Sequence, residues 1–205
     1  CFAVRGGKGI AAPSANRFGK VSPTRAEHVL ADLDGDVPLI LDGGDAQIGL
    51  ESTIVDLSTD RPRLLRPGAI SGSELGEVLG EPVGAAGPAA PRAPGSLASH
   101  YAPGTPVELV DGQELTGRVA SLRARGMRLA VWSREPVLAN SVEWLAAPTD
   151  PQAYARQLYD SLRRLDRLGV DRLLVETVPA GEAWDAVRDR LGRAATGSGG
   201  TVDRP

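Results

Sequence analysis

The sequence predicts an α/β protein with two globular segments, and three observations support this fold class. Residues 105–197 alternate short apolar runs with helical patterns, which is typical of βαβ units around a parallel sheet. Prolines alternate with Gly and Ala across residues 81–104, so this stretch is expected to be an extended linker. A chain of 205 residues, 41% of them hydrophobic, is long enough for one or two cores. We therefore expect one segment at residues 1–80, a second at 105–197 and a disordered tail at 198–205.

Short elements separated by Gly/Pro turns are expected in the first segment. Strands are predicted at residues 10–12, 37–41, 52–57 and 63–65. Two capping boxes predict the starts of two short helices, Thr24 with Glu27 and Ser71 with Glu74. Asp42-Gly43-Gly44 is typical of a turn after the second strand.

Longer and more regular elements are expected in the second segment. Strands are predicted at residues 107–110, 129–132 and 173–176, and helices at 115–125, from 151 onward, and at 184–195. Asp150-Pro151 supplies an N-cap and a first-turn proline for the middle helix, and Gly169 fits its C′ position. The apolar residues of that helix repeat at helical spacing: Tyr154, Leu158, Leu162 and Leu165. Its arginines are expected to form an exposed face: Arg163, Arg164 and Arg167.

Composition excludes several classes of function. The net charge of −3 argues against a broad nucleic-acid platform, so any direct contact with tRNA would have to be local. Cys1 is the one cysteine, which excludes a disulfide framework and a thiolate metal site and is compatible with the cytoplasm. No stretch approaches the roughly 20 apolar residues of a membrane span. His28 and His100 are too isolated to indicate a metal site.

Residues 11–24 form the most informative stretch, because they combine hydroxyl and amide side chains with two prolines and a glycine. Ser14 and Ser22 can donate hydrogen bonds to phosphate oxygens, and Asn16 can bridge a loop or a ligand. A helix is expected to begin just after this loop, and helix N-termini favour anions. These groups suit an anion site. The segment taken alone, however, fits a surface loop that caps its own backbone better.

Two further motifs place polar groups beside short strands. Ser52 follows Gly49-Leu50-Glu51 at the mouth of a strand, a usual place for ligand contacts, although the motif taken alone fits a hairpin turn with a polar strand start better. Arg66 lies between a short apolar run and Pro67-Gly68, which holds it in a defined direction. Its planar guanidinium suits phosphate, and a surface ion pair is the alternative.

Taken in order, these motifs resemble a known family. Pro-Ser-Ala-Asn, Ser-Pro-Thr, Asp-Gly-Gly, Gly-Leu-Glu-Ser-Thr-Ile-Val-Asp and Leu-Arg-Pro-Gly resemble the second half of a YrdC-like domain. The linker sequence at 100–104 and the closing helix at 189–195 are similar to those of two-domain threonylcarbamoyl-AMP synthases. The resemblance implies the C-terminal part of a twisted mixed-sheet α/β domain, followed by the linker and a small Rossmann-like domain.

The resemblance also implies a reaction. L-Threonine and bicarbonate form a threonylcarbamate, whose carboxylate attacks the α-phosphate of ATP and releases pyrophosphate. Mg²⁺ accompanies the ATP, and the adenylate passes to a tRNA threonylcarbamoyltransferase machinery. Charge builds on phosphate oxygens in such a reaction, so hydroxyl donors and an arginine fit it without a protein nucleophile.

Site residues follow from the resemblance, position by position. The residues expected to contact ATP are Ser14, Ser22, Arg66 and Tyr101, the last reaching over the nucleotide from the linker. Ala12 and Ser52 are expected to line the threonine site. Asn16 is expected to organise the loop. No catalytic nucleophile and no metal ligand are expected among these residues.

The family's YrdC-like domain begins with a stretch that contains a Lys-x-Arg motif, and residues 1–9 do not supply it. The 205 residues alone are therefore expected to make no threonylcarbamoyl-AMP, although residues 105–195 should fold. Two other functions remain as alternatives. One is a carbamoyltransferase of the hydrogenase-maturation type, and the other is a non-catalytic module that binds double-stranded RNA or tRNA.

Overall fold

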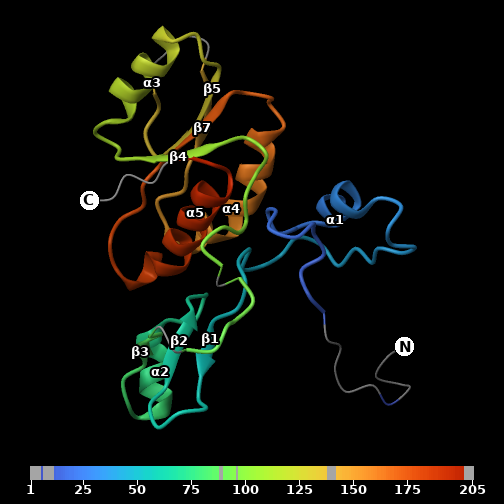
Figure 1. Ribbon diagram of the computed structural model, residues 1–205, viewed down its shortest axis with the longest axis vertical. Coiled ribbons are helices and arrows are strands. Elements are labelled where there is room, and N and C mark those ends of the chain that lie inside the picture. The colour runs from blue at the N-terminus through green and yellow to red at the C-terminus, as the bar shows by residue number, and fades with distance from the viewer. Residues whose placement is uncertain (1–5, 7–11, 88–89, 96, 138–141, 201–205) are drawn as a thin grey trace.

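The computed structural model of the protein describes residues 6, 12–87, 90–95, 97–137 and 142–200. It contains a four-stranded sheet with several helices packed on it and a three-stranded sheet with one short helix beside it (Figure 1). For clarity, residues 12–80 are called the N-terminal region and residues 105–200 the C-terminal region. None of the helices among the described residues has the length and apolar character that a membrane span requires.

The C-terminal region is built on a parallel sheet. Its strands are β4 (Val107–Val110), β5 (Leu129–Ser133), β6 (Glu143–Ala146) and β7 (Arg172–Glu176). They lie in the order β4-β7-β5-β6, and every neighbouring pair is parallel. The last strand in sequence is therefore inserted between the first two. This confirms the predicted parallel α/β sheet.

Helices cover both faces of this sheet, because its strands are buried on both sides. α3 (Leu115–Ala124) packs on one face through Val119 and Leu122, against Val131 and Leu174. α4 (Pro151–Asp166) and α5 (Asp185–Gly197) pack on the other face, and a 3-10 turn at Glu182–Trp184 precedes α5. The larger core joins this second face to α4 and α5.

α4 begins where its sequence signals place it. The Asp150 carboxylate accepts a hydrogen bond from the Ala153 nitrogen at 2.8 Å, and Pro151 occupies the first turn. Tyr154, Leu158 and Leu162 are at most 1% exposed, so the predicted apolar stripe is the one that faces the core. The helix ends at Asp166, and Gly169 adopts a φ of +63° shortly after the C-cap.

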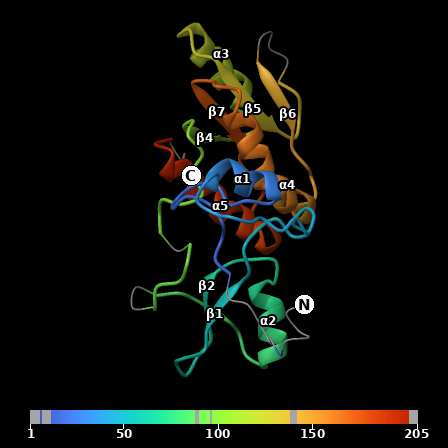
Figure 2. The same cartoon turned by 90° about the vertical axis from the view of Figure 1, so that its right-hand side faces the viewer.

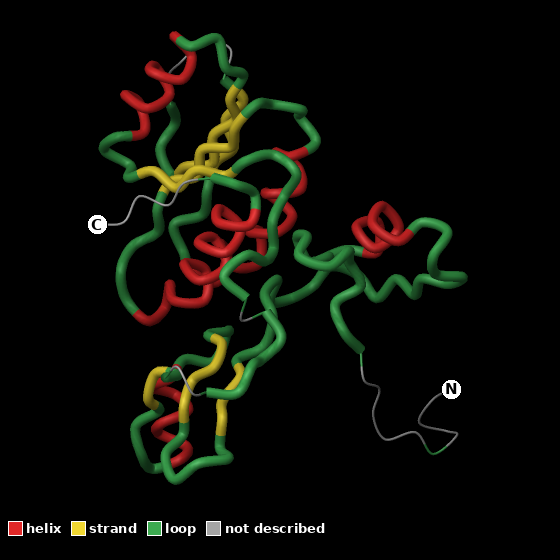
Figure 3. The backbone as a smooth tube through the Cα atoms, in the orientation of Figure 1, coloured by secondary structure: helices red, strands yellow, loops and turns green. Residues whose placement is uncertain are grey.

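The N-terminal region contains smaller elements. They are α1 (Ala26–Leu33), β1 (Ile54–Asp56), β2 (Arg63–Arg66) and α2 (Gly72–Leu79). β1 and β2 are antiparallel, and α2 has the predicted capping box between Ser71 and Glu74. Long loops connect these elements (Figure 3), and α1 lies to the side, against α4 (Figure 2).

Two predictions for the N-terminal region are wrong. Residues 37–41 form no strand, and Leu39 and Leu41 are exposed, so they have no sheet to join. Thr24 is not the N-cap of α1: its backbone nitrogen donates to His28 Nδ1 at 3.2 Å, and the cap position falls on Arg25. This local hydrogen bond to the His28 ring replaces the expected capping box. Of the strand expected at 10–12, residues 10–11 lie outside the described residues and Ala12 lies in a loop.

The linker is more structured than its composition predicts. β3 (Gly84–Ala85) pairs in parallel with β2, which makes the smaller sheet mixed. Further along, Ala102 forms a parallel bridge with Lys20, and its nitrogen donates to the Gly19 carbonyl at 2.9 Å. The prolines of the linker avoid these positions, so the backbone N–H groups needed for pairing are present.

Three features of the C-terminal region also differ from expectation. β6 was not predicted; it is an edge strand of the sheet, and three of its four residues are exposed. Arg163 is not exposed: it pairs with Asp32 at 2.6 Å and bonds to backbone carbonyls of the N-terminal region. Residues 198–200 pack onto β4, where the Ser198 hydroxyl accepts from the Val107 nitrogen at 2.9 Å. The rest of the expected tail, residues 201–205, lies outside the described residues.

Candidate functional site

Arg66 and Ser52 meet where β2 ends beside the start of β1. The Nε and Nη2 groups of Arg66 donate to the Ser52 carbonyl oxygen at 3.0 and 2.8 Å, and Nη2 lies 3.4 Å from the Ser52 hydroxyl. Nη1 donates to the carbonyl of Pro94 in the linker at 2.9 Å. Arg66 is buried, so these bonds fix the direction of its guanidinium. A surface ion pair, the alternative reading of this arginine, does not describe it.

Gly68 explains why the turn after Arg66 reads Pro-Gly. A Cβ atom at this position would lie 2.3 Å from the Thr53 nitrogen, far inside any permitted contact. Only glycine lets the turn approach the Ser52–Thr53 backbone this closely. The turn therefore sets the Ser52–Arg66 contact.

Tyr101 lies in the same place, brought there by the linker. It is 1% exposed. Among the described residues, it is the one non-glycine residue with a left-handed backbone, with a φ of +59°. Its hydroxyl lies beside Gly95, where an added Cβ would also come within 3.3 Å of the Arg66 guanidinium. Burial raises the pKa of the Tyr101 hydroxyl, so it is a neutral hydrogen-bonding group. The structure thus brings Tyr101 and Arg66 together.

Glu51 connects Ser22 to this group, and sequence reasoning assigned it no role. Its carboxylate accepts from the Ser22 hydroxyl at 2.6 Å, from the Tyr159 hydroxyl at 2.8 Å and from Arg190 Nε at 2.8 Å. Burial raises the pKa of Glu51, but hydrogen bonds from Ser22 and Arg190 outweigh it, and the pKa lies below its usual value. Glu51 is therefore an ionised, buried acceptor directly before Ser52.

Arg190, from α5, was also missed as a site residue. It is 0% exposed, and besides Glu51 its Nη2 donates to the Pro67 carbonyl at 3.0 Å. Its guanidinium carbon lies 5.3 Å from the centre of the Tyr101 ring, a cation–π contact. Burial lowers the pKa of Arg190, but Tyr159 and Glu51 more than compensate and raise it, so the charge is permanent.

The loop at residues 12–20 is held differently. Asn16 donates from Nδ2 to the carbonyls of Arg17 and Lys20 at 2.9 and 3.0 Å. Ala12 and Ser14 are exposed, and within the described part of the chain no hydrogen bond links Ser14 to the other site residues. The structure brings together Ser22, Ser52, Arg66 and Tyr101. Among the described residues, no hydrogen bond or ion pair ties the exposed Ala12 or Ser14 to them.

We call the residues that meet around these bonds the Glu51 cluster: Ser22, Glu51, Ser52, Arg66, Tyr101, Tyr159 and Arg190. It offers hydroxyl groups, two fixed guanidinium groups and one carboxylate. Such a set suits a ligand that carries both phosphate and hydroxyl groups. No group of three or more His, Cys, Asp or Glu residues that could hold a metal ion occurs in the part of the chain that the structure describes.

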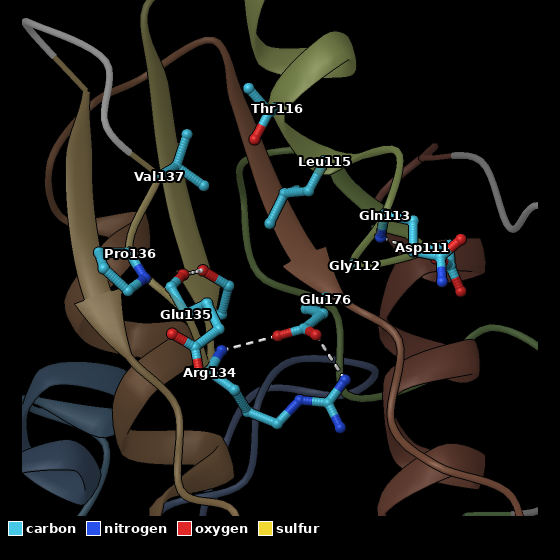
Figure 4. Close-up of a pocket in the computed structure, with 11 residues that line it drawn as sticks. Asp111, Gly112, Gln113, Leu115, Thr116, Arg134, Glu135, Pro136, Val137 and Glu176 are labelled. Carbon is cyan, nitrogen blue, oxygen red and sulfur yellow. Dashed lines mark hydrogen bonds and ion pairs between the residues drawn. The ribbon is translucent and has the colours of Figure 1, made fainter.

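A separate cavity lies at the carboxyl ends of β4, β5 and β7 (Figure 4). It measures about 350 Å³, and Leu115 and Val137 form part of its wall. Glu176 accepts from both the backbone nitrogen and the Nη2 of Arg134, at 2.6 and 2.5 Å. None of the residues predicted from the sequence lines this cavity, so it is distinct from the Glu51 cluster.

Comparison with known proteins gives consistent matches. A family model described as threonylcarbamoyl-AMP synthase, C-terminal domain, matches residues 70–196, and one described as telomere recombination matches residues 2–68. The threonylcarbamoyl-AMP synthases of Pyrococcus abyssi and Bacillus subtilis are 37% and 36% identical to this chain. The matches cover 91% and 92% of this chain and 57% of each relative.

A solved structure agrees with these relatives. The crystal structure of P. abyssi Sua5 complexed with L-threonine matches 92% of this chain with a TM-score of 0.80 and 35% identity. The match covers 58% of that chain. The chain thus spans a little over half the length of the relatives it matches.

Proposed function

The chain belongs to the threonylcarbamoyl-AMP synthase family, and from this premise we propose that it carries part of a site for threonylcarbamoyl-AMP formation. The substrates are L-threonine, bicarbonate and ATP, and pyrophosphate is the second product. The observation that supports this most directly is the convergence of Ser52, Arg66 and Tyr101, three residues from separate motifs, at one buried place.

Arg66 has the chemistry for the phosphate groups. Its bonds to Ser52 and Pro94 use at most four of the five N–H groups of its guanidinium. A phosphate oxygen can take a remaining N–H or displace the Pro94 carbonyl. As threonylcarbamate attacks the α-phosphate, negative charge grows on the phosphate oxygens, and a fixed guanidinium stabilises it.

Ser22 acts differently from the sequence-based expectation of a phosphate donor. A carboxylate only accepts, so the Ser22 hydroxyl proton is directed at Glu51. Ser22 therefore offers ATP its oxygen lone pairs, which suit a ribose hydroxyl or an amino group better than a phosphate. We infer that Tyr101 contributes a ring face near the nucleotide and that Ser52 lines the threonine site.

Other parts of the proposal rest on the resemblance to the family. Ser14 is assigned to ATP and Ala12 to threonine, and both require their exposed loop to approach the Glu51 cluster. Asn16 organises that loop through its two backbone hydrogen bonds. Mg²⁺ enters with ATP, and the product passes to a tRNA threonylcarbamoyltransferase machinery in the cytoplasm.

Replacing Arg66 tests the proposal. Arg66→Ala should weaken ATP binding about ten- to hundredfold, because a charged hydrogen bond contributes about 1.5–3 kcal/mol, and threonine binding should change less. Arg63→Ala, on the same strand, is the matched control and should leave both affinities unchanged. Calorimetric titration with each ligand measures the effect. An unchanged ATP affinity in Arg66→Ala would remove Arg66 from the site.

A further inference from the structure

Arg190 joins the two regions of the molecule through a single buried side chain. Its Nε reaches Glu51 at 2.8 Å and its Nη2 reaches the Pro67 carbonyl at 3.0 Å. Glu51 directly precedes Ser52 in the chain, and Pro67 directly follows Arg66. One planar guanidinium from α5 therefore fixes the neighbours of both residues that form the Ser52–Arg66 contact.

Glu51 extends this frame to a third motif. One carboxylate oxygen accepts from Ser22 at 2.6 Å, and the other accepts from Arg190 and Tyr159. Tyr159 lies on α4, is 1% exposed, and its ring centre is 5.5 Å from that of Tyr101. Ser22 is thus bonded to Glu51, and Tyr101 lies against Arg190. Ser52 follows Glu51 in the chain, and Arg66 precedes Pro67, whose carbonyl Arg190 binds.

We propose that Glu51 and Arg190 are positioning residues through which α5 sets the geometry of the ATP and threonine site. The inference rests on the proposed function, and it gives the C-terminal region a role in that site. Stability alone does not require such a pair, because well-packed apolar side chains of similar volume often serve as well as a buried ion pair. A planar guanidinium such as that of Arg190 does what apolar side chains cannot, since it holds two acceptors at a fixed distance and angle.

Arg190→Lys separates positioning from folding. Lysine keeps the positive charge beside Glu51, so the carboxylate stays compensated. It lacks the fork, so it cannot hold Glu51 and the Pro67 carbonyl together. Arg188→Lys is the matched control: it lies on the same helix and pairs with Asp185 at the surface.

Two measurements on this chain decide the proposal. Amide hydrogen exchange should be about tenfold faster in peptides covering residues 49–53 and 66–68 of Arg190→Lys, with melting of the C-terminal region nearly unchanged. ATP affinity should fall about tenfold in calorimetry. In Arg188→Lys both should match the unmodified chain.

Glu51→Gln supplies the coupling test. If the two residues act as one unit, combining Glu51→Gln with Arg190→Lys should change exchange and affinity little more than the larger single effect. Should Arg190→Lys lower the melting temperature strongly, Tyr159→Phe removes one hydroxyl only and should accelerate exchange at residues 49–53.

Exchange at wild-type rates in both peptides of Arg190→Lys, or in Tyr159→Phe when that variant takes its place, overturns the positioning role. Fully additive effects in the double variant overturn it as well. If the unmodified chain binds no ATP, that result counts against the proposed function. The exchange rates alone then test whether Glu51 and Arg190 are positioning residues.

Discussion

The N-terminal and C-terminal regions are held together by different forces. β4, β5 and β7 are buried on both faces, and the residues of two hydrophobic cores come almost entirely from the C-terminal region and Tyr101. In the N-terminal region, Val21 is the described residue that joins those cores as a buried member, while large side chains such as Phe18, Leu41 and Val78 are 85% exposed. The N-terminal region is therefore ordered mainly by contacts with its neighbour.

The polar contacts come from α4, from α5 and from the 3-10 turn that precedes α5. Arg163 pairs with Asp32, Arg190 with Glu51, and Glu182 accepts from both the nitrogen and the hydroxyl of Ser73. The comparison teaches that one region holds nearly all of the buried apolar side chains and the other holds most of the candidate site. Five predictions sharpen or break this comparison.

The largest difference in the free energy of unfolding is expected when a leucine is replaced by alanine in each region. Leu162→Ala, at a position with 0% exposure on α4, should lower the free energy of unfolding by about 2–5 kcal/mol because it leaves a cavity. Leu79→Ala, at a 39% exposed position on α2, should change it by no more than about 0.5 kcal/mol. Urea unfolding followed by tryptophan fluorescence measures both, since Trp132, Trp144 and Trp184 all lie in the C-terminal region. Equal losses would show that the N-terminal region has a core of its own.

The second prediction concerns the contact between α4 and α1. Arg163→Ala removes the partner of Asp32 and should cost about 1.5–3 kcal/mol locally, or about ten- to hundredfold in amide exchange of residues 26–33. Arg164→Ala, one residue further on the exposed side, is the control and should leave exchange unchanged. Tryptophan fluorescence melting should respond little to either change. A large drop in the melting temperature for Arg163→Ala would show that the two regions unfold as one unit.

Asp166 gives a smaller expected effect at the end of the linker. Its carboxylate accepts from the nitrogens of Gly104 and Thr105 at 2.9 and 2.7 Å, which ties the linker to α4. Asp166→Ala should lower stability by about 1–2 kcal/mol. Asp42→Ala removes one local bond to the Gly44 nitrogen in an exposed turn and should cost less than about 0.5 kcal/mol. Thermal melts compare them, and a reversed order would contradict the assignment of stability to the C-terminal region.

The smallest effects on stability are expected from a change of pH, and each region loses stability over its own pH range. Burial lowers the pKa of His28 below its usual 6.5, with Arg163 as a further cause. As pH falls below 6.5, the unfolded chain takes up a proton that folded His28 resists, so α1 loses stability by at most about 1.4 kcal/mol per pH unit. His100 has a lowered pKa in the same window, so His28→Gln should remove only the part that acts on α1. Amide exchange of residues 26–33 between pH 7.5 and 5.5 measures this, and an unchanged pH dependence in His28→Gln would refute it.

Glu108 sets the window of the C-terminal region. Burial raises its pKa, but hydrogen bonds from Arg118 and Arg172 outweigh burial and lower it. The stabilisation is present above the usual value of 4.5 and is lost as pH falls through the lower folded pKa. Melting between pH 6 and 3 should show this second loss, and Glu108→Gln should flatten it.

The C-terminal region could be predicted well because its signals and its contacts coincide. The apolar runs of β4, β5 and β7 are buried where they stand, and Asp150 caps the helix that it precedes. The prediction failed in the N-terminal region, where a competing local bond or the lack of a sheet partner decides the structure. Thr24 bonds to the His28 ring four residues further on instead of capping α1, and the exposed Leu39 and Leu41 lie outside any strand of the described residues.

For the candidate site, separation along the chain limited what could be predicted. Motif reasoning found Ser52 and Arg66, which lie 14 residues apart and meet across one antiparallel pair. It missed the pairing of Glu51 with Arg190, because 139 residues separate them and no local pattern links a carboxylate before a strand to an arginine in the last helix. The available signal was Glu51 itself, a single charged residue among the apolar and hydroxyl residues of its motif.

The position of β7 has a consequence for synthesis of the chain. This strand is central in the sheet but the last of its strands to be made, so β4 and β5 must wait for residues 172–176 before they can pair with it. During that interval the growing polypeptide carries two unpaired apolar strand edges, which are prone to aggregation. A ribosome that stalls before Arg172 would leave the sheet without its central strand β7. We expect the nascent chain to need chaperones most at this stage.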